Sequence, residues 1–209
     1  MVRQLLAISR KNDEQSPVPT DIASIVRESL KLLQSTAPRN IEIRQNIPAI
    51  CEKISIIPTR IHQIIINLCT NAIHAMEKCG GVLEVCLSST VIHETAAVTS
   101  GNLAPGTYVA LRVKDNGHGI PSECMDRIFD PFFTTKEGGR GSGLGLAVVQ
   151  GIVNRAGGTI SVQSEKDCGT CFDLFFPAIR ENGRPVCVPP YVQTDVEDTA
   201  VPENLRQAV

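Results

Sequence analysis

The chain has 209 residues, of which 42% are hydrophobic and 20% are charged, and its formal net charge is −2. This composition is typical of a globular protein of one or two domains and gives no sign of nucleic-acid binding or of an anionic membrane surface. No apolar run could span a bilayer, no secretory signal is present, and the eight cysteines are scattered, so we expect a cytoplasmic protein with free thiols.

Helix and strand patterns alternate along the chain. Apolar residues three and four apart predict helices, strict alternation predicts strands, and glycine pairs end two of the helices. The expected elements are a helix from Asp21 to residue 33, a strand over 41–47, a helix over 60–76, strands over 82–90 and 107–114, a helix over 144–155, and a hairpin of strands over 159–164 and 171–176. The small-residue segment 95–106 is expected to lack order.

The two ends of the chain differ in character from its middle. Residues 1–10 place apolar side chains on one helical face, and residues 11–19 are polar and proline-punctuated, as in a linker. Residues 181–209 carry prolines and acidic residues without a period, which predicts a disordered tail or a linker. The domain is therefore expected over residues 20–180. Its elements predict an α/β two-layer sandwich in which helices cover one face of a mixed sheet.

A glycine-rich loop precedes the third predicted helix. Gly141, Gly143 and Gly145 precede or open a helix whose first N–H groups have no internal partner, and Lys136 and Arg140 add positive charge. Such a helix end attracts anions, and glycine lets a phosphate approach the backbone. A flexible surface loop would explain the glycines alone. The spacing matches neither GxxxxGK[ST] nor GxGxxG, so it predicts a different scheme of phosphate binding.

Two further clusters predict the rest of a nucleotide site. Asp115 opens the segment DNGHGI after a strand, where a carboxylate in apolar surroundings needs a donor such as the adenine amino group. Guanine presents an acceptor there and would be rejected. Asn67 and Asn71 share one helix face. Their amides either bond other helices in the core or, opposite a nucleotide, supply the single protein ligand of a Mg²⁺ ion.

Together these clusters resemble the ATP-binding catalytic domain of sensor histidine kinases, in the GHKL family with its Bergerat-type fold. The resemblance extends over residues 19–177. NLCTNAIHAM resembles the N box, DNGHGI the G1 box, IFDPFFTTK the F box, GRGSGLGL the G2 box, and Gly169-Thr170 with Phe172 the G3 motif. The FFTTK and GSGLGL segments resemble the nitrogen-regulator-like branch of these kinases.

The resemblance implies that the cofactors are ATP and Mg²⁺, and it assigns roles to residues. Asn71 is the implied Mg²⁺ ligand, and the catalytic positions are Asn67, Lys136 and Arg140, of which the last two lie in an ATP lid. The implied nucleotide contacts are Asn71, His74, Asp115, Gly117, Gly119, Ile120, Phe132, Gly141, Ser142, Gly143, Leu144, Gly145, Leu146 and Thr170. Related ATPases carry a glutamate at the position of Asn67. An amide cannot activate water in that way, which suits an enzyme that keeps its γ-phosphate for a protein.

A histidine kinase also needs an acceptor histidine on a helical bundle. None of the four histidines fits, because His62 and His74 lie on the N-box helix, His118 lies in the G1 turn and His93 lies between strands. Residues 1–10 resemble the end of a dimerisation helix, so the chain is expected to begin just past the acceptor. The implied partners are a histidine-bearing dimerisation domain, in cis or in trans, and indirectly a response regulator receiver domain. The main alternative is a regulatory module that binds ATP without transferring phosphate. An ATP-hydrolysing machine is disfavoured by Asn67.

Overall fold

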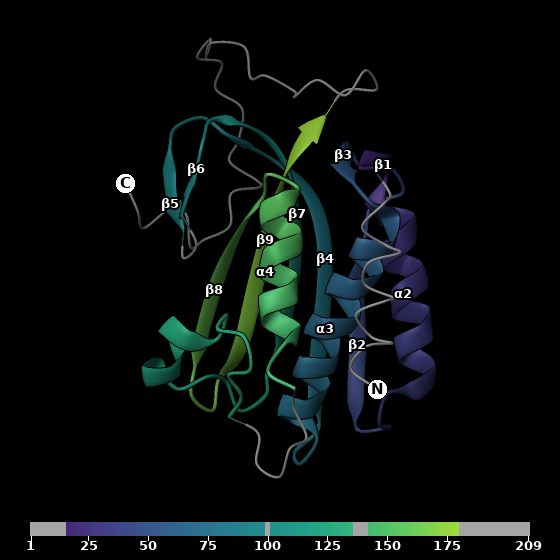
Figure 1. Cartoon of the computed structure of the whole chain (residues 1–209). Coiled ribbons are helices and arrows are strands. Elements are labelled where there is room, and N and C mark those ends of the chain that lie inside the picture. The colour runs from purple at the N-terminus through teal and green to yellow at the C-terminus, as the bar shows by residue number, and fades with distance from the viewer. Residues whose placement is uncertain (1–15, 99–100, 136–141, 180–209) are drawn as a thin grey trace, which may run out of the picture.

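The computed structural model describes residues 16–98, 101–135 and 142–179, and helices cover one face of its main sheet (Figure 1). The predicted stub over residues 1–10 and the predicted tail over 181–209 lie outside these residues. The elements are β1 (Val18–Thr20), α2 (Ile22–Thr36), β2 (Ile41–Asn46), β3 (Lys53–Ile56), α3 (Pro58–Met76), β4 (Gly81–Ile92), β5 (Ala96–Val98), β6 (Gly101–Leu103), β7 (Gly106–Asp115), the 3₁₀ helix η1 (Ser122–Arg127), α4 (Gly145–Arg155), β8 (Thr159–Glu165) and β9 (Gly169–Ile179). This is the α/β architecture that the sequence predicts.

The main sheet has seven strands in the order β1-β3-β9-β7-β4-β2, with β8 also paired to β9. The β2–β4 pair is parallel and the other pairs of this sheet are antiparallel, so the sheet is mixed. The long central pair of β7 and β9 has Asp115 opposite Thr170. The end of β7 and the start of β9, which are far apart in the sequence, therefore lie side by side.

The helices cover the sheet with strongly apolar faces. Asp21 caps α2 by accepting a hydrogen bond from the N–H of Ala23, and Pro58 opens α3, where its missing N–H costs nothing. Helix α3 buries one face completely, including Ile61, Ile64 and Leu68. In the described ranges, none of the helices combines the length and the apolar character that a membrane crossing requires.

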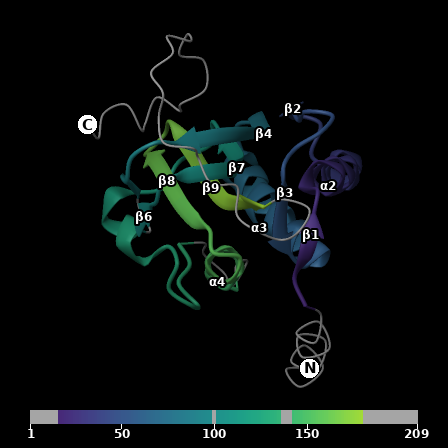
Figure 2. The ribbon, with the colours of Figure 1, turned by 90° about the horizontal axis from the view of Figure 1, so that it is seen from above.

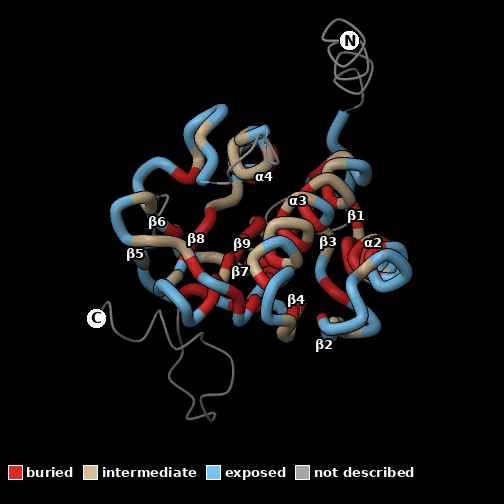
Figure 3. Tube along the Cα trace, turned by 90° about the horizontal axis from the view of Figure 1, so that it is seen from below, coloured by how far each residue is buried: buried red, intermediate tan, exposed pale blue. Residues whose placement is uncertain are grey.

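The core lies between these helices and the sheet. Because side chains alternate along a strand, Leu111 and Val113 of β7 and Leu174 of β9 face the helices, and each is at most 2% exposed. Figure 3 shows buried stretches along β7, β9 and the inner side of α3. Burial of this core holds α3 and the strand ends in fixed positions, which is what a site between them requires.

The opposite face of the sheet is partly covered by a hairpin that was not predicted from the sequence. The segment 95–106 was expected to lack order, yet it contains the hairpin β5–β6, which lies beside β8 (Figure 2). Leu103 is 1% exposed and packs with Ile92, Tyr108 and Phe175 on the outer face. The prediction was wrong because small residues hide the tertiary contact that orders the segment. Phe175 supplies the apolar surface, and local sequence cannot reveal it.

Two further strands were missed. Val18 and Pro19 fall at the end of the predicted linker, but with Thr20 they form β1, which pairs with β3. Both strands are too short to show a convincing alternation. The hydroxyl of Thr20 lies within hydrogen-bonding distance of two carbonyl oxygens, that of Val18 at 2.9 Å and that of Ile56 at 3.1 Å, and the second contact links the two strands.

The described cysteines are free thiols, as their spacing predicted. Burial raises the pKa of Cys69, inside α3, to about 12 and is the main cause that raises the pKa of Cys171, on β9, to about 12. Thiols with so high a pKa remain protonated at neutral pH and behave as small apolar side chains.

Candidate functional site

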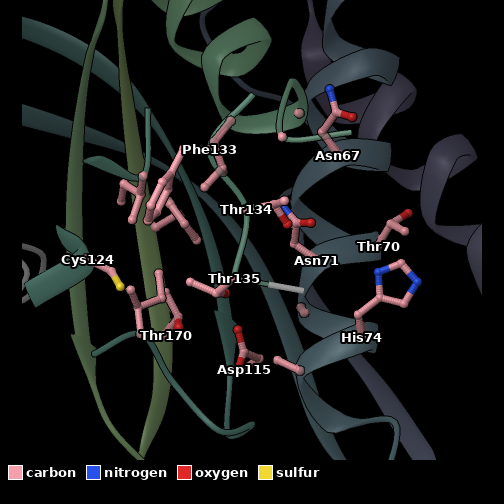
Figure 4. A pocket seen from close by; sticks show the side chains of 18 of the residues that line it. Asn67, Thr70, Asn71, His74, Asp115, Cys124, Phe133, Thr134, Thr135 and Thr170 are labelled. Atoms are coloured by element: carbon pink, nitrogen blue, oxygen red, sulfur yellow. The ribbon is translucent and has the colours of Figure 1, made fainter. Parts of the chain in front are cut away.

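A cavity of about 340 Å³ opens between α3, the ends of β7 and β9, and the start of α4. Its volume lies in the range of small-molecule sites, about 300–1,000 Å³. Figure 4 shows Asn67 and Asn71 on α3, across the cavity from Asp115 and Thr170 at the strand ends. Of the predicted site residues, the following line the cavity: Asn67, Asn71, His74, Asp115, Gly119, Ile120, Ser142, Gly143, Gly145, Leu146 and Thr170.

The α3 wall of the cavity is a polar stripe on an otherwise apolar helix. Asn67, Thr70, Asn71 and His74 are three or four residues apart and therefore share one side of α3. The opposite side of the helix is in the core, so the stripe is held in place. A Cβ added at Gly145 would lie 3.4 Å from Oδ1 of Asn67. The start of α4 thus comes close to this amide.

Asp115 is the buried carboxylate of the site, with 6% of its surface exposed. One of its oxygens, Oδ1, accepts a hydrogen bond from the N–H of Gly117 at 2.9 Å. Burial raises the pKa of this carboxyl above its ordinary value, against the opposing effects of hydrogen bonds from the backbone of Gly117 and Thr170 and of the charge of His118. A carboxylate so placed favours a ligand that brings a hydrogen-bond donor.

The loop after Asp115 packs backbone against backbone, which explains its glycines. A Cβ on Gly117 would lie 2.7 Å from Cβ of Ala75, and a Cβ on Gly119, whose φ is +67°, would lie 1.9 Å from the carbonyl oxygen of Glu165. The N–H of Asp167 donates to the carbonyl of His118 at 2.8 Å. The loop is therefore held between α3 and the β8–β9 turn, and no larger residue fits at these two glycines.

The start of α4 provides an anion-binding feature. Among the residues that the structure describes, no side chain caps this helix end, and Ser142, Gly143 and Gly145 line the cavity beside it. The N–H of Phe132 donates to the carbonyl of Gly143 at 2.9 Å, and both residues have positive φ, +70° and +65°. This contact joins the two ends of the segment 133–142. The N-terminus of α4 therefore lies at the cavity, and the N-terminus of a helix attracts anions.

Some predicted residues lie elsewhere. Gly117 is buried against Ala75, Phe132 is 74% exposed, and Leu144 is 37% exposed at the helix start; none of these three lines the cavity. Gly117 and Phe132 instead shape the site through their backbones. Lys136, Arg140 and Gly141 lie outside the described residues.

Several other residues line the cavity that were not predicted from the sequence, namely Thr70, Cys124, Phe133, Thr134 and Thr135. Helical spacing from Asn67 and Asn71 could have found Thr70. Cys124 belongs to η1 and the other three belong to the loop after it. Neither segment has a periodic pattern, so the folded structure is needed to bring them to the cavity.

The site fits a metal ion that takes few protein ligands. Within the described ranges, no three histidine, cysteine, aspartate or glutamate residues are grouped as a metal site. Mg²⁺ usually keeps waters and substrate phosphates and takes only one or two protein oxygens. The amide oxygen of Asn71, a half-buried lining residue, has the chemistry of such a ligand.

Residues 56–180 match the family described as histidine kinase-, DNA gyrase B-, and HSP90-like ATPase. The chain is 34% identical over 184 residues to the sensor kinase CckA of Brucella abortus (strain 2308), covering 88% of this chain and 19% of CckA. It is 37% identical over 158 residues to the sensor histidine kinase ZraS of Escherichia coli (strain K12), covering 75% of this chain and 30% of ZraS. The chain thus spans less than a third of either relative.

Solved structures share the fold. The nucleotide-free catalytic domain of the histidine kinase ThkA has a TM-score of 0.60 and 26% identity, over 78% of this chain and 97% of that one. Full-length ShkA in complex with AMPPNP has a TM-score of 0.61 and 27% identity, over 85% of this chain and 33% of that one. The similarity therefore covers most of this chain in sequence and in structure.

Proposed function

The chain belongs to the family of histidine kinase-, DNA gyrase B- and HSP90-like ATPases, and from this premise we propose that it transfers the γ-phosphate of ATP to a histidine on a dimerisation bundle. It acts as the ATP-binding catalytic domain of a sensor histidine kinase. The similarity to CckA and ZraS supports this assignment.

The chemistry of the cavity wall favours transfer over hydrolysis. Among the described lining residues, Asp115 is the only carboxylate, and it lies across the cavity from α3. Asn67 stands where the resemblance puts the water-activating glutamate of hydrolytic relatives. An amide does not accept a proton at neutral pH, so no side chain described at the α3 wall is a carboxylate base for water. This observation carries the proposal, because a γ-phosphate protected from water remains available to a protein acceptor.

The proposed roles follow the geometry. Asp115 accepts a hydrogen bond from the adenine amino group, and the start of α4 binds the phosphates. Asn71 holds Mg²⁺, which neutralises phosphate charge when it is bound with ATP. Lys136 and Arg140 add positive charge near the γ-phosphate in this proposal. The finer assignment to the nitrogen-regulator-like branch is supported by the sequences FFTTK and GSGLGL.

The proposed partners are a histidine-bearing dimerisation domain and, indirectly, a response regulator receiver domain. We further propose that the reaction takes place in the cytoplasm, where ATP is supplied. In this proposal residues 1–10 end a dimerisation helix, residues 11–19 link it to the catalytic domain over residues 20–180, and residues 181–209 form a tail or linker.

Phosphotransfer to a separate acceptor tests the proposal. The chain is incubated with Mg²⁺ and γ-labelled ATP, alone and with the dimerisation hairpin of a similar kinase. We expect no label on the chain itself, since His62 and His74 are fixed on the helix that forms the cavity wall. The hairpin should become labelled slowly, because no tether raises its effective concentration.

A hairpin whose acceptor histidine is replaced serves as the control and should remain unlabelled. Tight ATP binding without labelling of any matched hairpin would favour a regulatory module. Steady release of phosphate without an acceptor would favour a hydrolase. Acid-labile label on a histidine of the chain alone would contradict the proposed separation of catalytic domain and acceptor.

A further inference from the structure

Ser164 lies behind the cavity wall and contacts two of its residues. This half-buried residue of β8 is not itself in the lining. Its Oγ accepts a hydrogen bond from the N–H of Ile120 at 2.7 Å and lies 2.9 Å from both the carbonyl oxygen of Gly169 and Oγ1 of Thr170. Ile120 and Thr170 both line the cavity. One hydroxyl thus contacts two lining residues and the carbonyl oxygen of Gly169 at the start of β9.

Counting protons fixes the direction of these hydrogen bonds. A serine hydroxyl has one proton to donate and two lone pairs to accept with. The Gly169 carbonyl can only accept, so the proton of Ser164 must point to it; otherwise two oxygens would face each other at 2.9 Å without a proton. The Thr170 hydroxyl must then donate to Ser164. All three contacts are hydrogen bonds only in this arrangement.

This arrangement determines how the Thr170 hydroxyl can bind a ligand in the cavity. Once its proton is committed to Ser164, the Thr170 hydroxyl has only lone pairs left for a ligand. Thr170 pairs with Asp115 across β7 and β9, and Figure 4 shows both at the same side of the cavity. Two acceptors, a carboxylate and a hydroxyl, therefore lie side by side where the proposed base binds.

We propose that Ser164 is a positioning residue for base selectivity: it holds the Thr170 hydroxyl as an acceptor, so that a base with an amino group on this edge is favoured over one with an oxygen there. The contact between Thr170 and the base is direct or passes through one water. The inference rests on the proposed ATP-binding function and adds a determinant beside Asp115. Adenine has the required amino group, and hypoxanthine has an oxygen at the same position.

Calorimetric titration of the full chain with Mg-ATP and Mg-ITP tests the inference. In Ser164→Ala the Thr170 hydroxyl is released and can rotate to donate to the hypoxanthine oxygen. We expect the ratio of ATP to ITP affinity to fall by about tenfold, mainly because ITP binds more tightly. Thr170→Val removes the acceptor itself and should lower the ratio by a loss of ATP affinity. Adding Ser164→Ala to Thr170→Val should not change the ratio further, because the two residues act through one hydroxyl.

The controls separate selectivity from folding. Ser161→Ala removes a buried hydroxyl from the same strand on the opposite face, and it should leave the ratio unchanged. Ser164→Thr keeps a hydroxyl at this position and should therefore have the same ratio of ATP to ITP affinity as the unmodified chain. If Ser164→Ala does not fold, Ser164→Cys takes its place, because a thiol is only a weak hydrogen-bond partner, and it should lower the ratio in the same direction. An equal loss of affinity for both nucleotides in Ser164→Ala would overturn the inference and leave a purely structural role. Failure of the unmodified chain to bind ATP would instead contradict the proposed function.

Discussion

Asp115→Asn gives a direct test of the nucleotide site, because it changes the chemistry of a buried group and almost nothing of its shape. Oδ1 of Asp115 accepts the N–H of Gly117 at 2.9 Å. If the amide oxygen of the asparagine keeps this bond, its NH₂ group faces the cavity and meets the adenine amino group donor to donor. Hydrogen bonds to a charged acceptor contribute about 1.5–3 kcal/mol, so we expect ATP affinity to fall by about 10- to 150-fold.

The same substitution should not destabilise the fold. Burial raises the pKa of Asp115, so the ionised carboxylate is unfavourable in the folded chain at neutral pH. A neutral amide removes that unfavourable contribution. We therefore expect a melting temperature at pH 7 that is equal to that of the unmodified chain or higher.

Titration calorimetry with AMPPNP and thermal unfolding together decide the outcome. The reasoning requires weaker binding with an undiminished melting temperature. Unchanged affinity would remove Asp115 from the site. Weaker binding together with a large drop in melting temperature would mean that the carboxylate is mainly structural and that the cavity is distorted without it.

Further predictions concern the metal ligand, pH and the loop after Asp115. Asn71→Ala should lower ATP affinity only when Mg²⁺ is present and leave the melting temperature nearly unchanged, since alanine suits a helix interior; titration with and without EDTA checks this. ATP affinity should fall as the pH decreases, beginning above the ordinary pKa of an aspartate, because protonation of Asp115 removes an acceptor. The contribution of Asp115 to folding stability should increase over the same pH range, since its pKa is raised in the folded chain. A pH series of ATP titrations on the unmodified chain checks the first effect, and Asp115→Asn, which should lack it, is the control. Gly119→Ala should lower the free energy of unfolding by about 2 kcal/mol or more, because φ is +67° and the new Cβ would lie 1.9 Å from the carbonyl oxygen of Glu165. Denaturant unfolding measures it, and Gly106→Ala, with its nearest neighbour at 3.5 Å, is the control that should change little.

The main helices and strands could be predicted from the sequence, as could several residues of the candidate site. Helix α3 follows from its apolar period, and the amides of Asn67 and Asn71 follow from their spacing on it. Asp115 was placed at a strand end by the strand pattern that precedes it, and β7 does end at Asp115. These features are local, because each depends on a few neighbouring residues and their periodicity.

The contacts between distant segments follow from the folded structure and not from local sequence. The pairing of β7 with β9 brings Asp115 beside Thr170, and the β8–β9 turn brings Ser164 to Ile120. The order of the hairpin β5–β6 likewise depends on Phe175, a residue of β9. Contacts of this kind depend on strand register and on burial from several elements at once. No short stretch of sequence contains that information, which is why Ser164 and the hairpin became visible only in the folded chain.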